Sequence, residues 1–247
     1  MSAVVPAERA EAARGLMLEL FPEGFEERDA GGGVELAAYT DASGEERLWA
    51  AFGQAASETV PGGWEERWRQ FHRPVRIGPL WVGPPWERPE GDLAVTIEPG
   101  RAFGTGGHPT TRLCLELLLE LPPTSLLDVG CGSGVLAVAA ARLGFEPVIA
   151  LDHEAAAVDA TTRNAAANGV LVDVRAGDAL SGTLPGSAVT VANVTADLVR
   201  GLGERVHSEA VIASGYLESE SPELPGFVRS DRRTAGGWAA DLLRREE

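Results

Sequence analysis

The stretch from Leu126 to Asp152 constrains the fold more than any other part of the chain. It reads LLDVGCGSGVLAVAAARLGFEPVIALD, which predicts a strand at 126–129, a glycine turn, a helix at 135–143 and a second strand at 147–151. Glycine permits positive φ and lets a ligand lie against bare backbone. We expect the turn to deliver amide groups at the helix N-terminus, at the sheet edge where α/β proteins bind ligands.

The spacing of this stretch indicates which ligand it binds. An acid about 20 residues after a glycine turn is placed to hold the hydroxyls of an adenosine ribose, in NAD or in S-adenosylmethionine. A dinucleotide-binding turn has its third glycine where this chain has Val135. The pattern here is D-x-G-x-G-x-G, which resembles the first motif of class I methyltransferases. It predicts an S-adenosylmethionine site that includes Asp128, Gly130, Gly132, Gly134 and Asp152.

Composition narrows the class of partner. The formal charge of −16, from 37 acids against 21 bases, argues against sequence-independent binding of nucleic acid or of anionic membranes. It suits a basic protein partner. No apolar run reaches membrane-spanning length, and Cys114 and Cys131 form neither a metal-ligand cluster nor a disulfide framework. We expect a cytoplasmic monomer without a metal.

The chain divides into three predicted segments. Residues 1–56 predict a small α+β domain, with strands at 2–5, 25–28 and 33–40 and helices at 7–21 and 45–56. Residues 57–92 are rich in Pro, Gly and Trp and predict a linker, in which Trp64 and Trp68 share one helix face. Residues 93–247 predict the cofactor-binding domain.

A second glycine-rich loop precedes the central stretch. After a predicted strand at 93–97, Gly104-Thr105-Gly106-Gly107-His108 leads into a helix that begins at Pro109. We expect this loop to close over the cofactor, and the hydroxyl of Thr111 to reach a ligand at the sheet edge. His108 is a candidate catalytic residue because its ring can titrate near neutral pH, although a structural hydrogen-bonding role is the alternative.

The remaining strands complete the predicted sheet. Strands at 170–175, 188–191 and 209–214 and a terminal hairpin of 227–232 with 238–244 follow a helix at 154–168. Asp178 lies where a side chain often meets the adenine amino group. Asn193 ends the fourth strand; its carbonyl oxygen can orient an acceptor amine, or its side chain can cap the helix at 196–206.

Three segments together resemble one family closely: EPGRAFGTGGHPTTRLCLELL, LLDVGCGSGVLAVAAARLG with Asp152, and VANVTADLV. The family is the bacterial ribosomal protein methyltransferase PrmA, which modifies the large-subunit protein L-eleven. The resemblance implies a Rossmann-like class I methyltransferase sheet of seven mostly parallel strands, beside a small N-terminal α+β domain. It also implies cofactor and substrate contacts at Thr111, Gly130, Asp152 and Asn193, and a loop of Phe103, Thr105, Gly106 and His108 over the methionine end.

Two features depart from the family: the front domain has almost no first strand, and the helix between the fifth and sixth strands is nearly absent. Both departures affect what the resemblance implies about the identity of the substrate more than what it implies about the identity of the cofactor. The sequence predicts methyl transfer from S-adenosylmethionine to lysine ε-amino or N-terminal α-amino groups of a basic ribosomal protein. The alternatives are another protein lysine or a small amine as acceptor, an NAD-dependent oxidoreductase, and a silent binding module.

Overall fold

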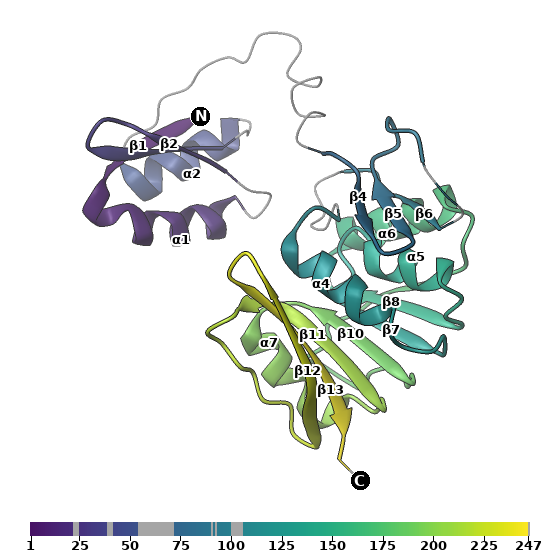
Figure 1. Cartoon of the computed structure of the whole chain (residues 1–247). Coiled ribbons are helices and arrows are strands. Elements are labelled where there is room, and N and C mark those ends of the chain that lie inside the picture. The colour runs from purple at the N-terminus through teal and green to yellow at the C-terminus, as the bar shows by residue number, and fades with distance from the viewer. Residues whose placement is uncertain are drawn as a thin grey trace. The chain divides into compact units, whose positions relative to one another are not determined.

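The computed structural model describes residues 1–21, 25–38, 42–53, 72–89, 91, 93–99 and 106–246. These residues form two compact units, Met1–Trp68 and Arg69–Glu247, shown in Figure 1. The predicted Trp64–Trp68 pair lies outside the described residues, as do Phe103 and Thr105. No helix in the described ranges is long and apolar enough to span a membrane.

The described part of the first unit contains a three-stranded antiparallel sheet and the helices α1 and α2. Its sheet order is β1-β3-β2, and the core centres on Met17, Leu36 and Leu48, which are completely buried. The elements are β1 (Ser2–Pro6), η1 (Ala7–Arg9), α1 (Ala10–Leu20), β2 (Glu26–Asp29), β3 (Gly33–Ala37) and α2 (Ala42–Phe52). The predicted stub at 2–5 is a full strand, because β1 pairs with β3 over five positions.

A second small sheet belongs to the larger unit. It contains β4 (Val75–Ile77), β5 (Leu80–Gly83) and β6 (Ala94–Thr96), and β5 pairs parallel to β6. The first two strands lie within the stretch 57–92 that was predicted as a linker. Their apolar residues join the core that also contains α4 and α5, so β4 and β5 pack on the domain that follows them.

The main sheet has the predicted seven strands, in the order β12-β13-β11-β10-β7-β8-β9. The five strands from β11 to β9 pair in parallel, and the terminal hairpin adds β13 and β12 antiparallel. The strands are β7 (Leu126–Val129), β8 (Val148–Asp152), β9 (Asp173–Ala176), β10 (Val189–Asn193), β11 (Ala210–Leu217), β12 (Phe227–Ala235) and β13 (Trp238–Arg245).

Alternate residues of the central strands bury both faces of this sheet. Leu126 of β7 packs with residues of α4 and α5, whereas the next residue, Leu127, packs with residues of α7 on the opposite face. The helices are α4 (Pro109–Leu118), α5 (Val135–Arg142), α6 (Ala155–Ala167) and α7 (Ala196–Leu202), followed by η2 (Gly203–Arg205). This burial explains why the strands read as nearly continuous apolar runs.

Several predicted boundaries were wrong, among them the start of the third strand and the end of the helix after the fourth strand. The third strand begins at Asp173 and not at residue 170, because the amide of Val170 still donates to the carbonyl of Ala165 at the end of α6. The helix predicted to reach residue 206 ends at Leu202, because Gly203 adopts a positive φ of 41°.

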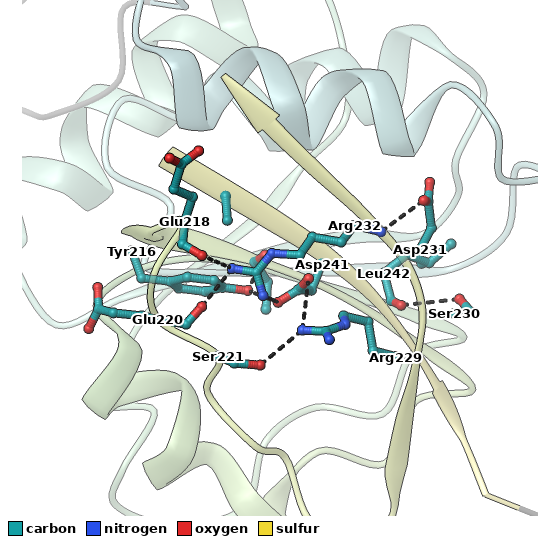
Figure 2. Close-up of polar contacts among 12 residues, drawn as sticks. Tyr216, Glu218, Glu220, Ser221, Arg229, Ser230, Asp231, Arg232, Asp241 and Leu242 are labelled. Atoms are coloured by element: carbon teal, nitrogen blue, oxygen red, sulfur yellow. Dashed lines mark hydrogen bonds and ion pairs between the residues drawn. The ribbon is translucent and has the colours of Figure 1, made fainter. Parts of the chain in front are cut away.

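The segment between β11 and β12 contains no helix, as the two prolines in it predicted, and side chains hold it in place (Figure 2). The Arg232 guanidinium donates to the carbonyls of Glu218 and Glu220, at 3.0 and 2.6 Å. Arg229 donates to the hydroxyl of Ser221 at 2.9 Å. Both arginines lie beside the buried carboxylate of Asp241 on β13, so the hairpin anchors this segment to the sheet.

Candidate functional site at the carboxyl edge of the sheet

The predicted site residues converge where the order of the strands reverses. The first parallel strand, β7, lies between β8 and β10, and the three strands end at the same edge. The glycine turn follows β7, Asp152 ends β8 and Asn193 ends β10. This is the position at which open α/β sheets bind ligands.

Neighbouring elements leave no space for side chains in the glycine turn. Gly130, Gly132 and Gly134 have φ values of 70°, 54° and 80°. A Cβ atom on Gly130 would lie 2.6 Å from Cγ1 of Val194, and one on Gly134 would lie 2.7 Å from Cγ2 of Thr161. The turn is therefore fitted closely between the end of β10 and α6.

Most amides of this turn already have acceptors within the chain, which corrects the expectation that the turn as a whole would deliver its amides to a ligand. The donors bind acceptors within the chain: Gly130 and Cys131 donate to the Leu151 carbonyl, Gly132 to Asp152, Gly134 to the Cys131 carbonyl, Val135 to Ser133 and Ala137 to Asp128. A pyrophosphate needs such donors. Their internal use favours a ligand without a pyrophosphate.

Asp152 holds the turn and still has capacity to accept further hydrogen bonds. Its Oδ2 accepts from the amide of Gly132 and its Oδ1 from the amide of Glu154, both at 3.0 Å. Each carboxylate oxygen has a second lone pair. The side chain can therefore bind two hydroxyl groups without losing either contact.

Asp128 lies beneath the turn. It is buried, and its Oδ2 accepts from the amide of Ala137 in the first turn of α5 at 3.1 Å. Burial raises the pKa of its carboxyl to about 7, the hydrogen bond from Ala137 lowers it, and the charge of Asp152 raises it further. Among the described residues, Oδ1 has no hydrogen-bond partner.

Asn193 and Thr111 meet where β10 ends. The amide nitrogen of Asn193 donates to the hydroxyl of Thr111 at 3.5 Å, and Thr111 is completely buried in the first turn of α4. The carbonyl oxygen of Asn193 is buried without a hydrogen-bond partner in the described part of the chain. Asn193 does not cap α7, since Thr195 does so by accepting from the amide of Leu198.

His108 begins α4. Its Nδ1 lies 2.8 Å from the hydroxyl of Thr110 and accepts from the amide of Thr110, so the ring caps the helix. The ring also meets Trp238 edge to face, with centroids 4.9 Å apart. Burial lowers the pKa of His108. Trp238 begins β13 and was not predicted as part of the site, because 130 residues separate it from His108.

Two predicted contacts lie at the margins. Gly106 has a φ of 89°, and a Cβ atom there would lie 2.6 Å from Cγ1 of Val82. Asp178 is exposed after β9 and accepts from the amide of Leu180, while the preceding Gly177 donates to the carbonyl of Asp152. Asp178 therefore remains at the same edge as Asp152, whereas Gly106 packs against β5 of the small sheet.

Sequence reasoning missed the polar residues of α6. Thr161 donates to the carbonyl of Gly132, and Asn164 donates to the carbonyl of Ser133, so the helix binds the glycine turn from behind. The available signal was a set of polar residues, Thr161, Asn164 and Asn168, spaced three and four apart in an alanine-rich helix.

Comparisons with known proteins agree with this geometry. A family model described as ribosomal protein L11 methyltransferase (PrmA) matches residues 35–232. A protein named ribosomal protein L11 methyltransferase from Symbiobacterium thermophilum is 46% identical over 197 residues, which cover 72% of this chain and 64% of the relative. One of the same name from Heliobacterium modesticaldum is 34% identical over 216 residues, covering 80% and 68%.

A solved structure has the same fold. The ribosomal protein L11 methylase from Lactobacillus delbrueckii subsp. bulgaricus is 28% identical, with a TM-score of 0.62, and the match covers 71% of this chain and all of that one. This confirms the predicted Rossmann-like methyltransferase fold. The matches span about two thirds of the length of the curated relatives named above.

Proposed function

Because the chain belongs to the family of ribosomal protein L11 methyltransferases, we propose that it transfers methyl groups from S-adenosylmethionine to amino groups of a large-subunit ribosomal protein. The acceptors are lysine ε-amino groups, N-terminal α-amino groups, or both. The observation that carries the proposal is the convergence of the glycine turn, Asp152 and Asn193 at one edge of the sheet.

The residues at this edge fit the proposed cofactor. Asp152 would accept the ribose hydroxyls on the lone pairs that Gly132 and Glu154 leave free. The internal use of the turn amides disfavours the pyrophosphate of NAD, and with it the alternative of a nicotinamide-dependent oxidoreductase.

When bound, S-adenosylmethionine supplies a methyl group on a positively charged sulfur. The task of the protein is then to align a neutral amine with that methyl group and to exclude water. A lysine with an ordinary pKa near 10.4 loses its proton as it enters a less polar environment. Asn193 Oδ1 would accept a hydrogen bond from the amine and orient its lone pair, while Thr111 holds the amide group of Asn193.

For His108 we propose a positioning role within the catalytic set. With Nδ1 accepting from the amide of Thr110, the neutral ring carries its proton on Nε2. Such a ring orients the first turn of α4, where Thr111 binds Asn193. We assign it this role and not that of accepting a proton from the substrate. The remaining predicted contacts, Thr105, Gly106 and Asp178, belong to the same proposal as parts of the cofactor site.

The proposed partner is a basic protein. A net charge of −16 favours a lysine-rich substrate and disfavours direct nucleic-acid binding. Ribosomal proteins have this basic character, and we propose that the chain acts on one in the cytoplasm. Another protein lysine or a small amine is the alternative acceptor.

The direct test is incubation of the chain with isotope-labelled S-adenosylmethionine and purified large-subunit ribosomal proteins, followed by mass spectrometry. We expect label on amino groups of the protein called L11, the substrate that the relatives' names specify. Label on a different protein would redirect the substrate proposal, and the absence of label from every protein would refute methyl transfer to this class.

Two substitutions separate the proposed roles. Asp152→Ala should weaken S-adenosylhomocysteine binding at least tenfold, or about 1.4 kcal/mol, because a charge-assisted hydrogen bond is lost. Asn193→Ala should leave this affinity nearly unchanged and lower turnover. Calorimetry and methyl-transfer rates measure the two effects. Equal loss of affinity and turnover in Asn193→Ala would contradict its role toward the acceptor.

A further inference from the structure

The inner face of α6 carries a buried polar stripe, defined as Thr161, Asn164 and Asn168. Their exposed fractions are 0%, 2% and 5%, and their spacing of three and four residues places them on one helix face. Buried amide and hydroxyl groups are costly unless they are hydrogen-bonded. Each member of the stripe has such partners, and the partners come from two separate segments of the chain.

Asn168 binds the small sheet. Its Oδ1 accepts from the amide of Thr96 at 2.8 Å, and its Nδ2 donates to the carbonyl of the same residue at 2.6 Å. Its Nδ2 also lies 2.7 Å from the carbonyl of Asn164. The side chain thus satisfies both backbone groups of one residue of β6, as a neighbouring strand would.

Asn164 joins two segments. Its Oδ1 accepts from the amide of Glu98 at 3.0 Å, and its Nδ2 donates to the carbonyl of Ser133 at 2.8 Å. Ser133 belongs to the glycine turn. Glu98 lies just after β6, where the chain leads toward Gly106 and His108. A single planar amide therefore connects the glycine turn to the chain just after β6.

Thr161 supports the turn at the neighbouring residue. Its hydroxyl donates toward the carbonyl of Gly132 at 3.0 Å and lies 3.3 Å from Sγ of Cys131. Thr161 and Asn164 thereby hold two successive carbonyls of the turn, at Gly132 and Ser133, against α6. The orientation of these peptide groups determines which side of the turn a ligand meets.

We propose that Asn164 is a positioning residue that holds the glycine turn in register with the chain at Glu98, just after β6, and so fixes the orientation of the turn that the cofactor meets. This role rests on the proposed function. It requires both halves of the amide: the oxygen for Glu98 and the nitrogen for Ser133. Alanine loses both contacts, and aspartate keeps an acceptor for Glu98 but places a carboxylate beside the carbonyl of Ser133.

Asn168 provides a matched control. It is the same residue type, at the C-cap of the same helix and at similar burial, and it makes three hydrogen bonds to Thr96 and Asn164. None of these involves the glycine turn. Loss of the Asn168 side chain should therefore lower stability at least as much as loss of the Asn164 side chain, without the same effect on the cofactor site.

The experiment measures S-adenosylhomocysteine affinity by calorimetry and thermal midpoint for the wild type, Asn164→Ala, Asn164→Asp and Asn168→Ala. We expect both Asn164 variants to bind about fivefold or more weakly, the effect of losing roughly one hydrogen bond's contribution. Asn168→Ala should bind within about twofold of the wild type, with an equal or larger loss of thermal midpoint.

Hydrogen exchange supplies a second readout that does not depend on the ligand. Asn164→Ala should raise exchange in peptides covering residues 130–136 and 94–98, whereas Asn168→Ala should raise it only in the latter. If Asn164→Ala does not fold, Asn164→Asp carries the same comparison.

Equal effects of the Asn164 and Asn168 substitutions on affinity and on exchange at the turn would overturn the positioning role alone. Failure of the wild type to bind S-adenosylhomocysteine would instead refute the proposed function, and the positioning role with it. The two failures are therefore distinguishable.

Discussion

Two buried polar networks of the larger unit satisfy the backbone in different ways. At the candidate site, the α6 stripe uses neutral amide and hydroxyl groups that bind carbonyls and amides of neighbouring segments. At the hairpin, the carboxylate of Asp241 lies 3.5 and 3.8 Å from the guanidinium groups of Arg232 and Arg229 (Figure 2). Tyr216 donates to the same carboxylate at 2.9 Å.

The stripe is neutral and the hairpin cluster is charged, and this difference follows from the backbone segment that each network holds in place. The stripe fixes backbone at the candidate site without adding a charge, so its contacts should not change between pH 4 and 9. The hairpin cluster holds the segment between β11 and β12, which contains no helix, and it does so with buried charge. A buried charge that loses its partner is far more costly than a lost neutral hydrogen bond.

The largest expected effect is on stability at the hairpin. Asp241→Ala removes the carboxylate from two guanidinium groups and from Tyr216, and should lower the free energy of unfolding by about 3–5 kcal/mol. Urea unfolding measures this change, with Asn168→Ala as the neutral counterpart. The comparison fails if Asp241→Ala costs no more stability than Asn168→Ala.

The second expected effect concerns pH at the glycine turn, where Asp128 is the charged group beside a neutral stripe. Burial raises its pKa from 3.8 to about 7. Between pH 4 and pH 7 the folded state holds a proton on Asp128 that the unfolded chain has lost. The contribution of the protonated carboxyl to the free energy of unfolding is complete below pH 4 and disappears as the pH rises through 7.

The Asp128→Asn variant cannot ionise at this position, so it should not lose this part of its free energy of unfolding as the pH rises. Its stability relative to the wild type should rise from pH 4 to pH 7 by up to roughly 4 kcal/mol and then level off. Urea unfolding across this range measures the difference. A difference that does not vary with pH would show that Asp128 is not the titrating group of the turn.

The smallest expected effect separates the charges of the hairpin from its neutral contacts. Tyr216→Phe removes the donor that binds Asp241 and the carbonyl of Ala213, but leaves both arginines beside the carboxylate. It should cost about 1 kcal/mol. A loss in urea unfolding as large as that of Asp241→Ala would mean that the tyrosine, and not the ion pairs, supports the cluster.

Local patterns were enough to predict the central frame of the molecule. The strand at 126–129 was predicted with its observed bounds, because a fully buried strand reads as an apolar run and a glycine turn ends it. The terminal hairpin around Gly236 was also predicted, although both of its strands are longer than expected. In both regions the decisive interactions lie close together in the sequence.

The rest of the site depends on contacts between distant residues. The turn amides appeared available because the acceptors that bind them include Asp152, which is 20 residues away from Gly132. The role of Asn168 was not visible, since its partner Thr96 is 72 residues earlier. The contact of His108 with Trp238 likewise appears only after the hairpin has folded onto α4.

The central claim is that an adenosine-bearing sulfonium cofactor binds at the carboxyl edge of β7 and β8, with its ribose on Asp152. A crystal structure of the chain with S-adenosylhomocysteine tests this claim most directly. The account predicts both ribose hydroxyls within hydrogen-bond distance of the Asp152 carboxylate and the ligand against the backbone of Gly130–Gly134. A ligand bound elsewhere, or a ribose held by another residue, would contradict it.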